Sequence, residues 1–72
     1  MIIDNIINDI DSNLFHTAEY DGHELELYTN DNRRVEVYDV EEIEFIKLQR
    51  NPTHEACENL MQKHGYKIFG CW

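Results

Sequence analysis

The feature that most constrains this chain is the alternation of apolar and polar residues on both sides of Asp21-Gly22. Successive side chains of a β-strand point to opposite faces of a sheet, so such alternation predicts strands with one buried face. Asp-Gly between two alternating runs is typical of a hairpin with a two-residue turn. The pairs that this turn predicts are Tyr20 with His23, Ala18 with Leu25, and His16 with Leu27.

A third alternating run follows Asn30-Asp31-Asn32 and predicts a neighbouring strand in which Leu27 faces Val35 and Glu26 faces Glu36. The core face is then expected to carry Leu14, His16, Ala18, Tyr20, His23, Leu25, Leu27, Val35 and Val37. The outer face is expected to carry Phe15, Thr17, Glu19, Glu24, Glu26, Tyr28, Arg34, Glu36 and Tyr38. Opposed glutamates cost about 0.2 to 1 kcal/mol, whereas each exposed aliphatic side chain forfeits about 1.5 to 3 kcal/mol, so the hydrophobic pattern sets this register.

Residues 1–13 carry isoleucines at positions 2, 3, 6, 7 and 10, a spacing typical of one helix face. We expect an amphipathic helix whose isoleucines cover the sheet, with a dimer seam or a partner surface as the alternatives. Residues 43–49 favour a further strand, either directly after a turn or after a short helical turn at 40–42.

Residues 51–65 predict a second helix, with Asn51 as a cap, Pro52 in the first helical position and Gly65 at the C-terminal end. Its inner face would hold Ala56, Cys57, Leu60, Met61 and His64. Residues 66–72 predict a last strand with Ile68 inside and Tyr66 or Phe69 near an edge. The predicted fold is α+β in a single domain over residues 1–72: one small, mainly antiparallel sheet of four or five strands and two helices, in the order α-β-β-β-β-α-β.

Fifteen acidic and six basic residues give a net charge of −9. This charge disfavours direct contact with nucleic acids and anionic membranes and favours a basic protein as partner. Residues 1–50 hold thirteen acids and four bases, whereas residues 51–72 hold two of each. No stretch approaches the roughly 20 apolar residues of a membrane span, and the N-terminus lacks the cationic region of a signal peptide. We therefore expect a cytoplasmic protein, in the host cytoplasm if a phage encodes it.

Candidate chemistry is sparse. His54, Cys57, His64 and Cys71 are zinc-binding residue types, but His64 would lie about 15 Å from His54 along a helix, so we expect no shared ion. Both cysteines are expected as thiols, with Cys57 buried. The predicted pairing gives His16 and His23 no Ser or Cys neighbour, and a pleated face offers Glu26 and Glu36 no pocket. The acidic run 39–44 lacks the glycine and spacing of a calcium loop. We expect no enzyme, metal site or cofactor.

The predicted outer face sets glutamates among aromatic rings, which protein interfaces concentrate. The candidate partner-binding residues are Phe15, Glu19, Glu24, Glu26, Tyr28, Glu36, Tyr38, Asp39, Glu41, Glu42 and Glu44, with Asp4, Asp9 and Asp11 as an extension. They predict a non-enzymatic acidic module that occupies the basic, nucleic-acid-binding groove of a partner and mimics nucleic acid. In size and acidity the chain is similar to small phage proteins that disarm host nucleases, including anti-CRISPR inhibitors. Two alternatives remain: a face that only confers solubility, or a homodimeric structural or regulatory subunit joined through the isoleucines or residues 66–72.

Overall fold

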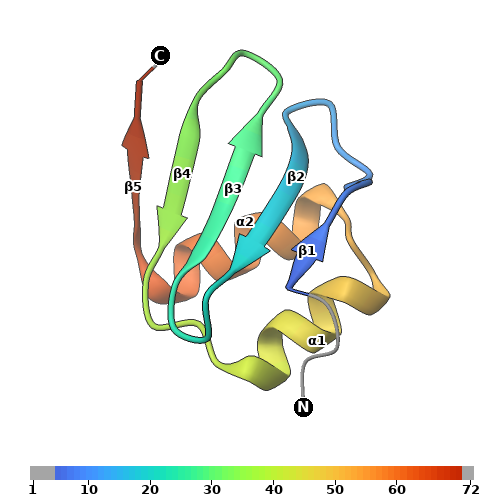
Figure 1. Cartoon of the computed structure of the whole chain (residues 1–72), viewed down its shortest axis with the longest axis vertical. Helices are drawn as coiled ribbons and strands as arrows, with labels where there is room; N and C mark the ends of the chain where they lie inside the picture. The colour runs from blue at the N-terminus through green and yellow to red at the C-terminus, as the bar shows by residue number, and fades with distance from the viewer. Residues whose placement is uncertain (1–4, 71–72) are drawn as a thin grey trace.

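The computed structural model describes residues 5–70, which form a five-stranded antiparallel sheet and two helices (Figure 1). The elements are β1 (Ile6–Ile7), β2 (Phe15–Tyr20), β3 (Leu25–Thr29), β4 (Arg34–Val37), α1 (Glu42–Arg50), α2 (His54–His64) and β5 (Tyr66–Phe69). The strands lie in the sheet in the order β1-β2-β3-β4-β5, which is also their order along the chain.

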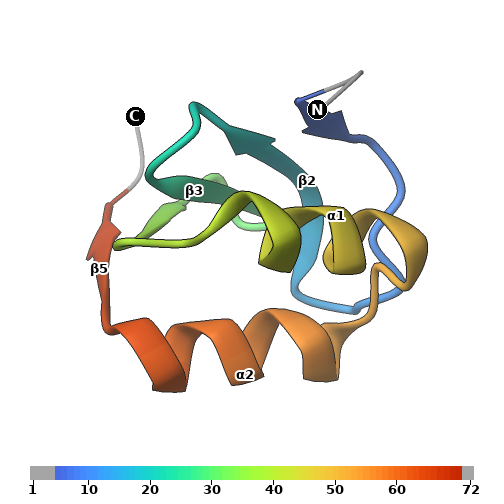
Figure 2. The same ribbon diagram turned by 90° about the horizontal axis from the view of Figure 1, so that it is seen from below.

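The molecule has two layers. Both helices lie against one face of the sheet (Figure 2), and no helix of residues 5–70 covers the opposite face, which we call the open face. The core fills the space between the layers, where Phe45 and Leu48 of α1 and Cys57 of α2 are buried with the side chains on the inner face of the strands. Tyr20 stacks on Phe45 with 4.8 Å between ring centroids, and its hydroxyl donates to the backbone carbonyl of Val40.

The α+β class and the antiparallel sheet are as predicted, but the helices are placed differently, in the order β-β-β-β-α-α-β. The predicted helix at 1–13 is wrong over the residues that the structure describes, because Ile6–Ile7 pairs with β2. Ile7 and Ile10 are nevertheless in the core. The predicted strand at 43–49 is also wrong, since this segment is α1.

The β2–β3 hairpin has a four-residue turn, residues 21–24, instead of the predicted two-residue turn. Tyr20 faces Leu25, and Ala18 faces Leu27. The carboxylate of Asp21 explains the longer turn, because it accepts the backbone N–H groups of His23 and Glu24 at 2.9 and 2.7 Å. The register differs by two residues from the prediction, so the paired side chains of this hairpin keep their predicted faces from residue 17 onwards, whereas His23 now lies in the turn.

Before residue 17 a β-bulge breaks the alternation. The register shifts between Phe15 and Thr17, so that Phe15 faces Thr29 while Thr17 faces Tyr28. Phe15 therefore turns into the core, where it is 1% exposed, and its predicted place on the outer face is wrong. His16 and Leu14, both predicted on the core side, are exposed. The bulge is favourable because it buries the apolar ring of Phe15 and leaves the polar imidazole of His16 in solvent.

The β3–β4 pair matches the prediction, with Leu27 facing Val35 and Glu26 facing Glu36. Leu25, Leu27, Val35 and Val37 are buried as expected, but His23 is exposed. The last strand is confirmed as β5 over Tyr66–Phe69. Its Ile68 was expected inside and is 49% exposed, because the helices cover β4 and not the edge beyond it.

The second helix begins two residues later than predicted, after Thr53, whose side chain accepts the backbone N–H of Ala56. Gly65 ends α2 with a φ of +82°, the positive value that glycine adopts most easily. Within residues 5–70, neither helix is long and apolar enough to cross a membrane.

Candidate partner-binding surface

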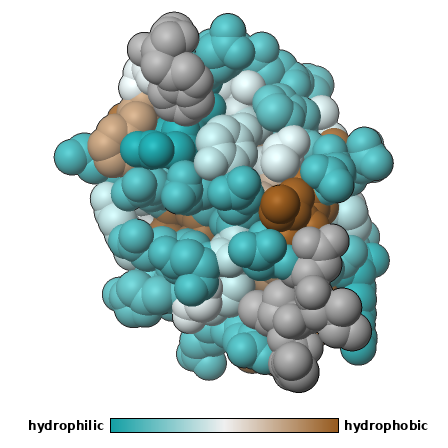
Figure 3. All heavy atoms as spheres, in the orientation of Figure 1, coloured by the Kyte–Doolittle hydropathy of each residue, from teal (hydrophilic) through white to brown (hydrophobic). Residues whose placement is uncertain are grey.

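The open face of the sheet carries a cross-strand row with three glutamates at its centre. Ile6 faces Glu19, Glu19 faces Glu26, Glu26 faces Glu36, and Glu36 faces Lys67. The next row contains Thr17, Tyr28, Arg34 and Phe69. Figure 3 shows this face as mostly hydrophilic with a few apolar patches. The prediction that Glu19, Glu26, Glu36 and Tyr28 share the outer face is confirmed by this register.

Basic side chains compensate the central glutamates. Arg34 lies 3.8 Å from the carboxylate of Glu26 and 3.6 Å from that of Glu36, and its guanidinium stands 4.6 Å from the centre of the Phe69 ring. Lys67 is the register partner of Glu36. The open face is therefore less acidic than the sequence of β2, β3 and β4 suggests. Like charges are tolerated in the row because a guanidinium reaches two of them.

Tyr28 is half-buried beside this row, and its hydroxyl donates to Glu26 at 3.2 Å. Burial, together with the negative charge of Glu26, raises the pKa of the Tyr28 hydroxyl. The hydroxyl therefore stays protonated near neutral pH and acts as a donor.

A stronger concentration of negative charge lies at one end of the sheet, where the β2–β3 turn meets the segment from β4 to α1. Val40 donates its backbone N–H to the carbonyl of His23 at 2.9 Å, and this bond joins the two segments. We call this region the acidic end. It comprises Asp21, Glu24, Asp39, Glu41 and Glu42.

The carboxylates of the acidic end are exposed, except that of Glu24, which is half-buried. One basic side chain of the described residues, His23, lies against them, with its Nε2 3.0 Å from Asp39. The pKa of the buried Tyr20 hydroxyl is raised. Burial is the largest cause, and the negative charges of Glu42 and Asp21 raise this pKa further. In contrast, the N–H groups of Glu24 and His23 lower the pKa of the Asp21 carboxyl.

The structure brings eight of the predicted partner-binding residues together in two groups and places the others elsewhere. Glu19, Glu26, Glu36 and Tyr28 lie on the open face, and Glu24, Asp39, Glu41 and Glu42 lie at the acidic end. Tyr38 is half-buried just beyond β4, where its backbone N–H donates to Gly65. Phe15 is in the core and Glu44 is engaged within the chain, so these two are not accessible surface groups of the folded chain. Of the predicted extension, Asp9 and Asp11 are exposed on the chain before β2, and Asp4 lies outside the described residues.

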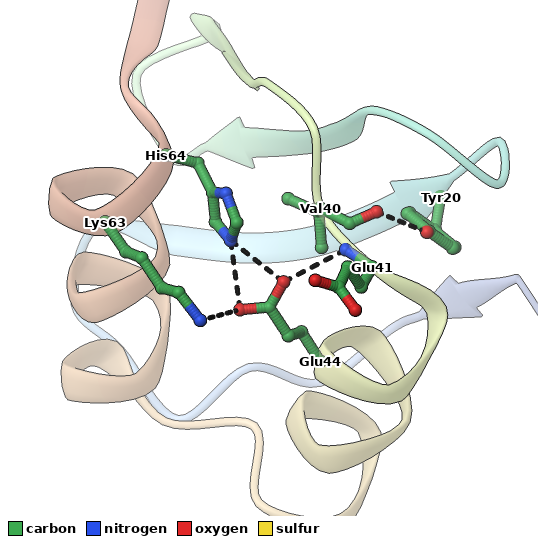
Figure 4. A network of polar contacts seen from close by, with 6 residues as sticks. All are labelled: Tyr20, Val40, Glu41, Glu44, Lys63 and His64. Carbon is green, nitrogen blue, oxygen red and sulfur yellow. Dashed lines mark hydrogen bonds and ion pairs between the residues drawn. The ribbon is translucent and has the colours of Figure 1, made fainter.

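Glu44 joins the beginning of α1 to the end of α2 (Figure 4). Its carboxylate accepts the backbone N–H of Glu41 at 3.0 Å and the ammonium of Lys63 at 2.8 Å, and it lies 2.9 Å from Nε2 of His64. Burial opposes ionisation of this side chain, but the bonds from Lys63, Glu41 and His64 outweigh that effect and lower the pKa of Glu44 to about 2. Glu44 is therefore a fixed negative charge near neutral pH.

A shallow groove of about 470 Å³ runs between the two helices. Leu48, Ala56 and Leu60 contribute its apolar part, and Lys47, Asn51, Asn59 and Lys63 its polar rim. Glu44 also lines it but holds its proton too weakly to act as a general acid at neutral pH. The groove is the space between the two helices, and Glu44 contributes to it no proton donor of suitable pKa.

A serine, a histidine and a glutamate form a hydrogen-bonded series, the residue types of a hydrolytic triad. Ser12 Oγ lies 2.7 Å from Nδ1 of His54, and Nε2 of His54 contacts the carboxylate of Glu58. The N–H groups of Leu14 and Phe15 also donate to Ser12 Oγ, at 3.0 and 3.1 Å. The hydroxyl oxygen therefore accepts two backbone N–H groups besides its contact with His54, an arrangement that holds the Ser12 side chain in place. The series fastens the chain before β2 to α2.

Sequence reasoning missed this series because Ser12 and His54 are 42 positions apart and no local pattern links them. Among residues 5–70, no three His, Cys, Asp or Glu side chains lie close enough to hold a metal ion together. Cys57 is a buried free thiol, and burial raises its pKa to about 11, so it is protonated and unreactive at neutral pH. The expected thiol of Cys71 lies outside the described residues.

Comparison with family models, with curated proteins and with solved structures finds no match to this chain.

Proposed function

We propose that this chain is a non-enzymatic acidic protein-binding module whose acidic end inserts into a basic groove of another protein. The observation that carries the proposal is the gathering of five carboxylates, most of them exposed, from two separate segments at one end of the sheet. The open face lies alongside and would add Tyr28 and Glu19 to the contact.

The distribution of charge supports the acidic end over the centre of the open face. Arg34 and Lys67 offset the glutamates of the open face, so a basic partner would gain less there. At the acidic end the carboxylates of Glu42 and Asp21 add to the effect of burial, which is larger, in raising the pKa of Tyr20. Complementary fields speed the encounter of two proteins and make their binding sensitive to salt.

Basic grooves commonly bind DNA or RNA through phosphate contacts, so the partner that fits best is a nucleic-acid-binding protein or nuclease. Occupation of its groove by carboxylates would exclude nucleic acid, which makes inhibition the proposed outcome. Small phage proteins that disarm host nucleases, including anti-CRISPR inhibitors, are the class of protein that this proposal suggests.

The test compares two triple variants that remove the same number of charges. The first changes the acidic end, Glu24→Gln, Asp39→Asn and Glu42→Gln. The matched control changes exposed acids away from the acidic end, Asp9→Asn, Asp11→Asn and Glu55→Gln; Asp9 and Asp11 belong to the predicted extension, which this proposal leaves out of the contact. Asp21 and Glu41 stay unchanged because Asp21 accepts two backbone N–H groups of its turn and Glu41 is the N-cap of α1.

Each protein is immobilised, and capture from a lysate of the native host is measured at about 0.1 M and about 1 M salt, where the Debye length is about 10 Å and about 3 Å. A partner that the parent chain captures is then purified and its affinity measured. We expect the acidic-end variant to bind at least about tenfold more weakly, a difference of about 1.4 kcal/mol, and the control to bind nearly as the parent does. Equal losses in both variants would show that only net charge matters and would reject the acidic end as the site. A partner whose nucleic acid does not compete for binding would reject inhibition through groove occupation.

A further inference from the structure

β5 is an edge strand with an open side. Its four residues pair with β4 on one side, and no other strand of residues 5–70 lies on the other. Proteins usually blunt such edges with charges, proline, bulges or a covering segment. β5 carries one charged residue, Lys67, and no proline. The opposite edge, β1, is only two residues long and offers much less backbone for pairing.

β5 also exposes apolar side chains on the helix side of the sheet. Tyr66 and Ile68 are 47% and 49% exposed, although their register partners on β4, Val37 and Val35, are almost fully buried. The helical layer therefore stops at β4. A strand that docked on β5 would extend the sheet and cover Tyr66 and Ile68 together.

The sequence of β5 selects one self-complementary register. In an antiparallel pair, directly opposed side chains lie on the same face of the sheet. The inner-face positions of β5 are even-numbered, so two copies match inner face to inner face only when even-numbered positions oppose even-numbered positions. With Ile68 opposite Ile68 of a second copy, Lys67 falls opposite Phe69. Within one chain Lys67 Nζ already lies 5.3 Å from the centre of the Phe69 ring, so the pairing repeats a favourable contact. Of the two neighbouring registers, one would oppose two Lys67 side chains, which is unfavourable, and the other would place Ile68 opposite Gly70, which has no side chain to cover it.

We propose that β5 is a homodimerisation edge: two copies pair antiparallel about Ile68 and join their sheets into one continuous sheet, with the helical layers on the same side. The interface is between the least acidic parts of the two chains, since residues 51–72 carry as many bases as acids. Strands of this length make a small contact, so the dimer is reversible and depends on concentration.

The first test is sedimentation velocity of the full chain over a range of concentrations, for Ile68→Asp and for the control Ile43→Asp. Ile43 is 53% exposed on α1, so the control makes the same substitution at a similar exposure away from β5. We expect Ile68→Asp to raise the dimer dissociation constant at least about tenfold, because it removes a central apolar contact and opposes two carboxylates, and Ile43→Asp to leave it nearly unchanged. A parent chain that stays monomeric at every concentration, or equal effects of both variants, would overturn the proposal.

The second test fixes the register and does not depend on the folding of the aspartate variant. In a Cys71→Ser background, Ile68→Cys is expected to form disulfide-linked dimers under mild oxidation several-fold faster than Lys67→Cys, because only position 68 lies opposite itself. Faster linkage through position 67 would overturn the proposed register.

Salt separates this proposal from the proposed function. Two chains of charge −9 repel each other, so dimerisation is expected to strengthen as salt is added, whereas capture of a basic partner weakens. A self-association that weakened with salt would contradict pairing through the apolar edge while leaving the acidic-end proposal intact.

Discussion

Glu44 shows how one side chain stabilises several parts of this small fold. It caps the first turn of α1 and binds Lys63 and His64 in the last turn of α2. Both positions suit the helix dipoles, since an anion is favourable at the N-terminus of α1 and cations are favourable at the C-terminus of α2. The side chain is 13% exposed, so solvent screens these contacts less than it would at an open surface.

We expect Glu44→Gln to lower the free energy of unfolding by about 1 to 2 kcal/mol at neutral pH. The loss should also change the dependence of stability on pH. The folded-state pKa of Glu44 is about 2 and its ordinary value is 4.5, so its contribution is complete above pH 4.5 and disappears as the pH falls towards 2. Urea denaturation between pH 7 and pH 2 measures both effects.

The exposed Glu55, in the first turn of α2, provides a matched control for this substitution. Glu55→Gln should leave the acid part of the pH profile as in the parent chain. A Glu44→Gln variant that loses as much stability below pH 4.5 as the parent would show that other carboxyl groups account for the acid sensitivity.

At the scale of elements, the bulge in β2 decides which aromatic ring enters the core. Phe15→Ala should lower the free energy of unfolding by about 3 to 5 kcal/mol, because it empties a fully buried site. Leu14→Ala, one residue away and largely exposed, should cost much less. Urea denaturation followed by circular dichroism measures both. If the two variants lost similar stability, Phe15 would not occupy the core.

The end of α2 depends on backbone conformation at Gly65. Space is not the limit there, since an added Cβ would meet no atom within 4 Å. The backbone conformation is the limit: φ +82° with ψ 156° is a region that residues with a Cβ avoid, so Gly65→Ala should cost about 1 to 3 kcal/mol. Gly70→Ala has equal space and no positive φ, so its thermal unfolding midpoint should stay near that of the parent. A similar midpoint for both variants would argue against strain at Gly65.

Sequence patterns predicted the elements whose alternation or punctuation is local. Leu25, Leu27, Val35 and Val37 identified the inner face of β3 and β4, and Gly65 marked the end of α2. The segment 43–49 was misassigned because short apolar runs fit a strand or a helix equally well. The helix at this segment is capped by the side chain of Glu44, which accepts the backbone N–H of Glu41. In the sequence, Glu44 is part of an acidic run and so gave no sign of a cap.

Other errors came from features that no local pattern records. The turn at Asp21-Gly22 grew to four residues because the Asp21 carboxylate binds backbone groups. Alternation assigned Ile68 to the correct side of the sheet, but a pattern cannot tell where the covering layer ends. The candidate surface was predicted in part: the glutamate row is present, but Arg34 and Lys67 moderate it, and the acidic end forms through the packing of two distant segments.

At the scale of the whole molecule, the order of the strands in the sheet matters for assembly. β1 to β4 follow one another as neighbours, so their contacts join residues close in sequence, whereas Val35 and Ile68 pair across both helices. Contacts between residues close in sequence lose less chain entropy when they form. We therefore expect the four-stranded meander to form early and β5 to complete the sheet last. Substitutions in the meander should therefore slow refolding, and substitutions in β5 should chiefly accelerate unfolding, in stopped-flow measurements. Since β5 is expected to join the sheet last, its free edge is formed only in the folded chain, and association through it would follow folding rather than accompany it.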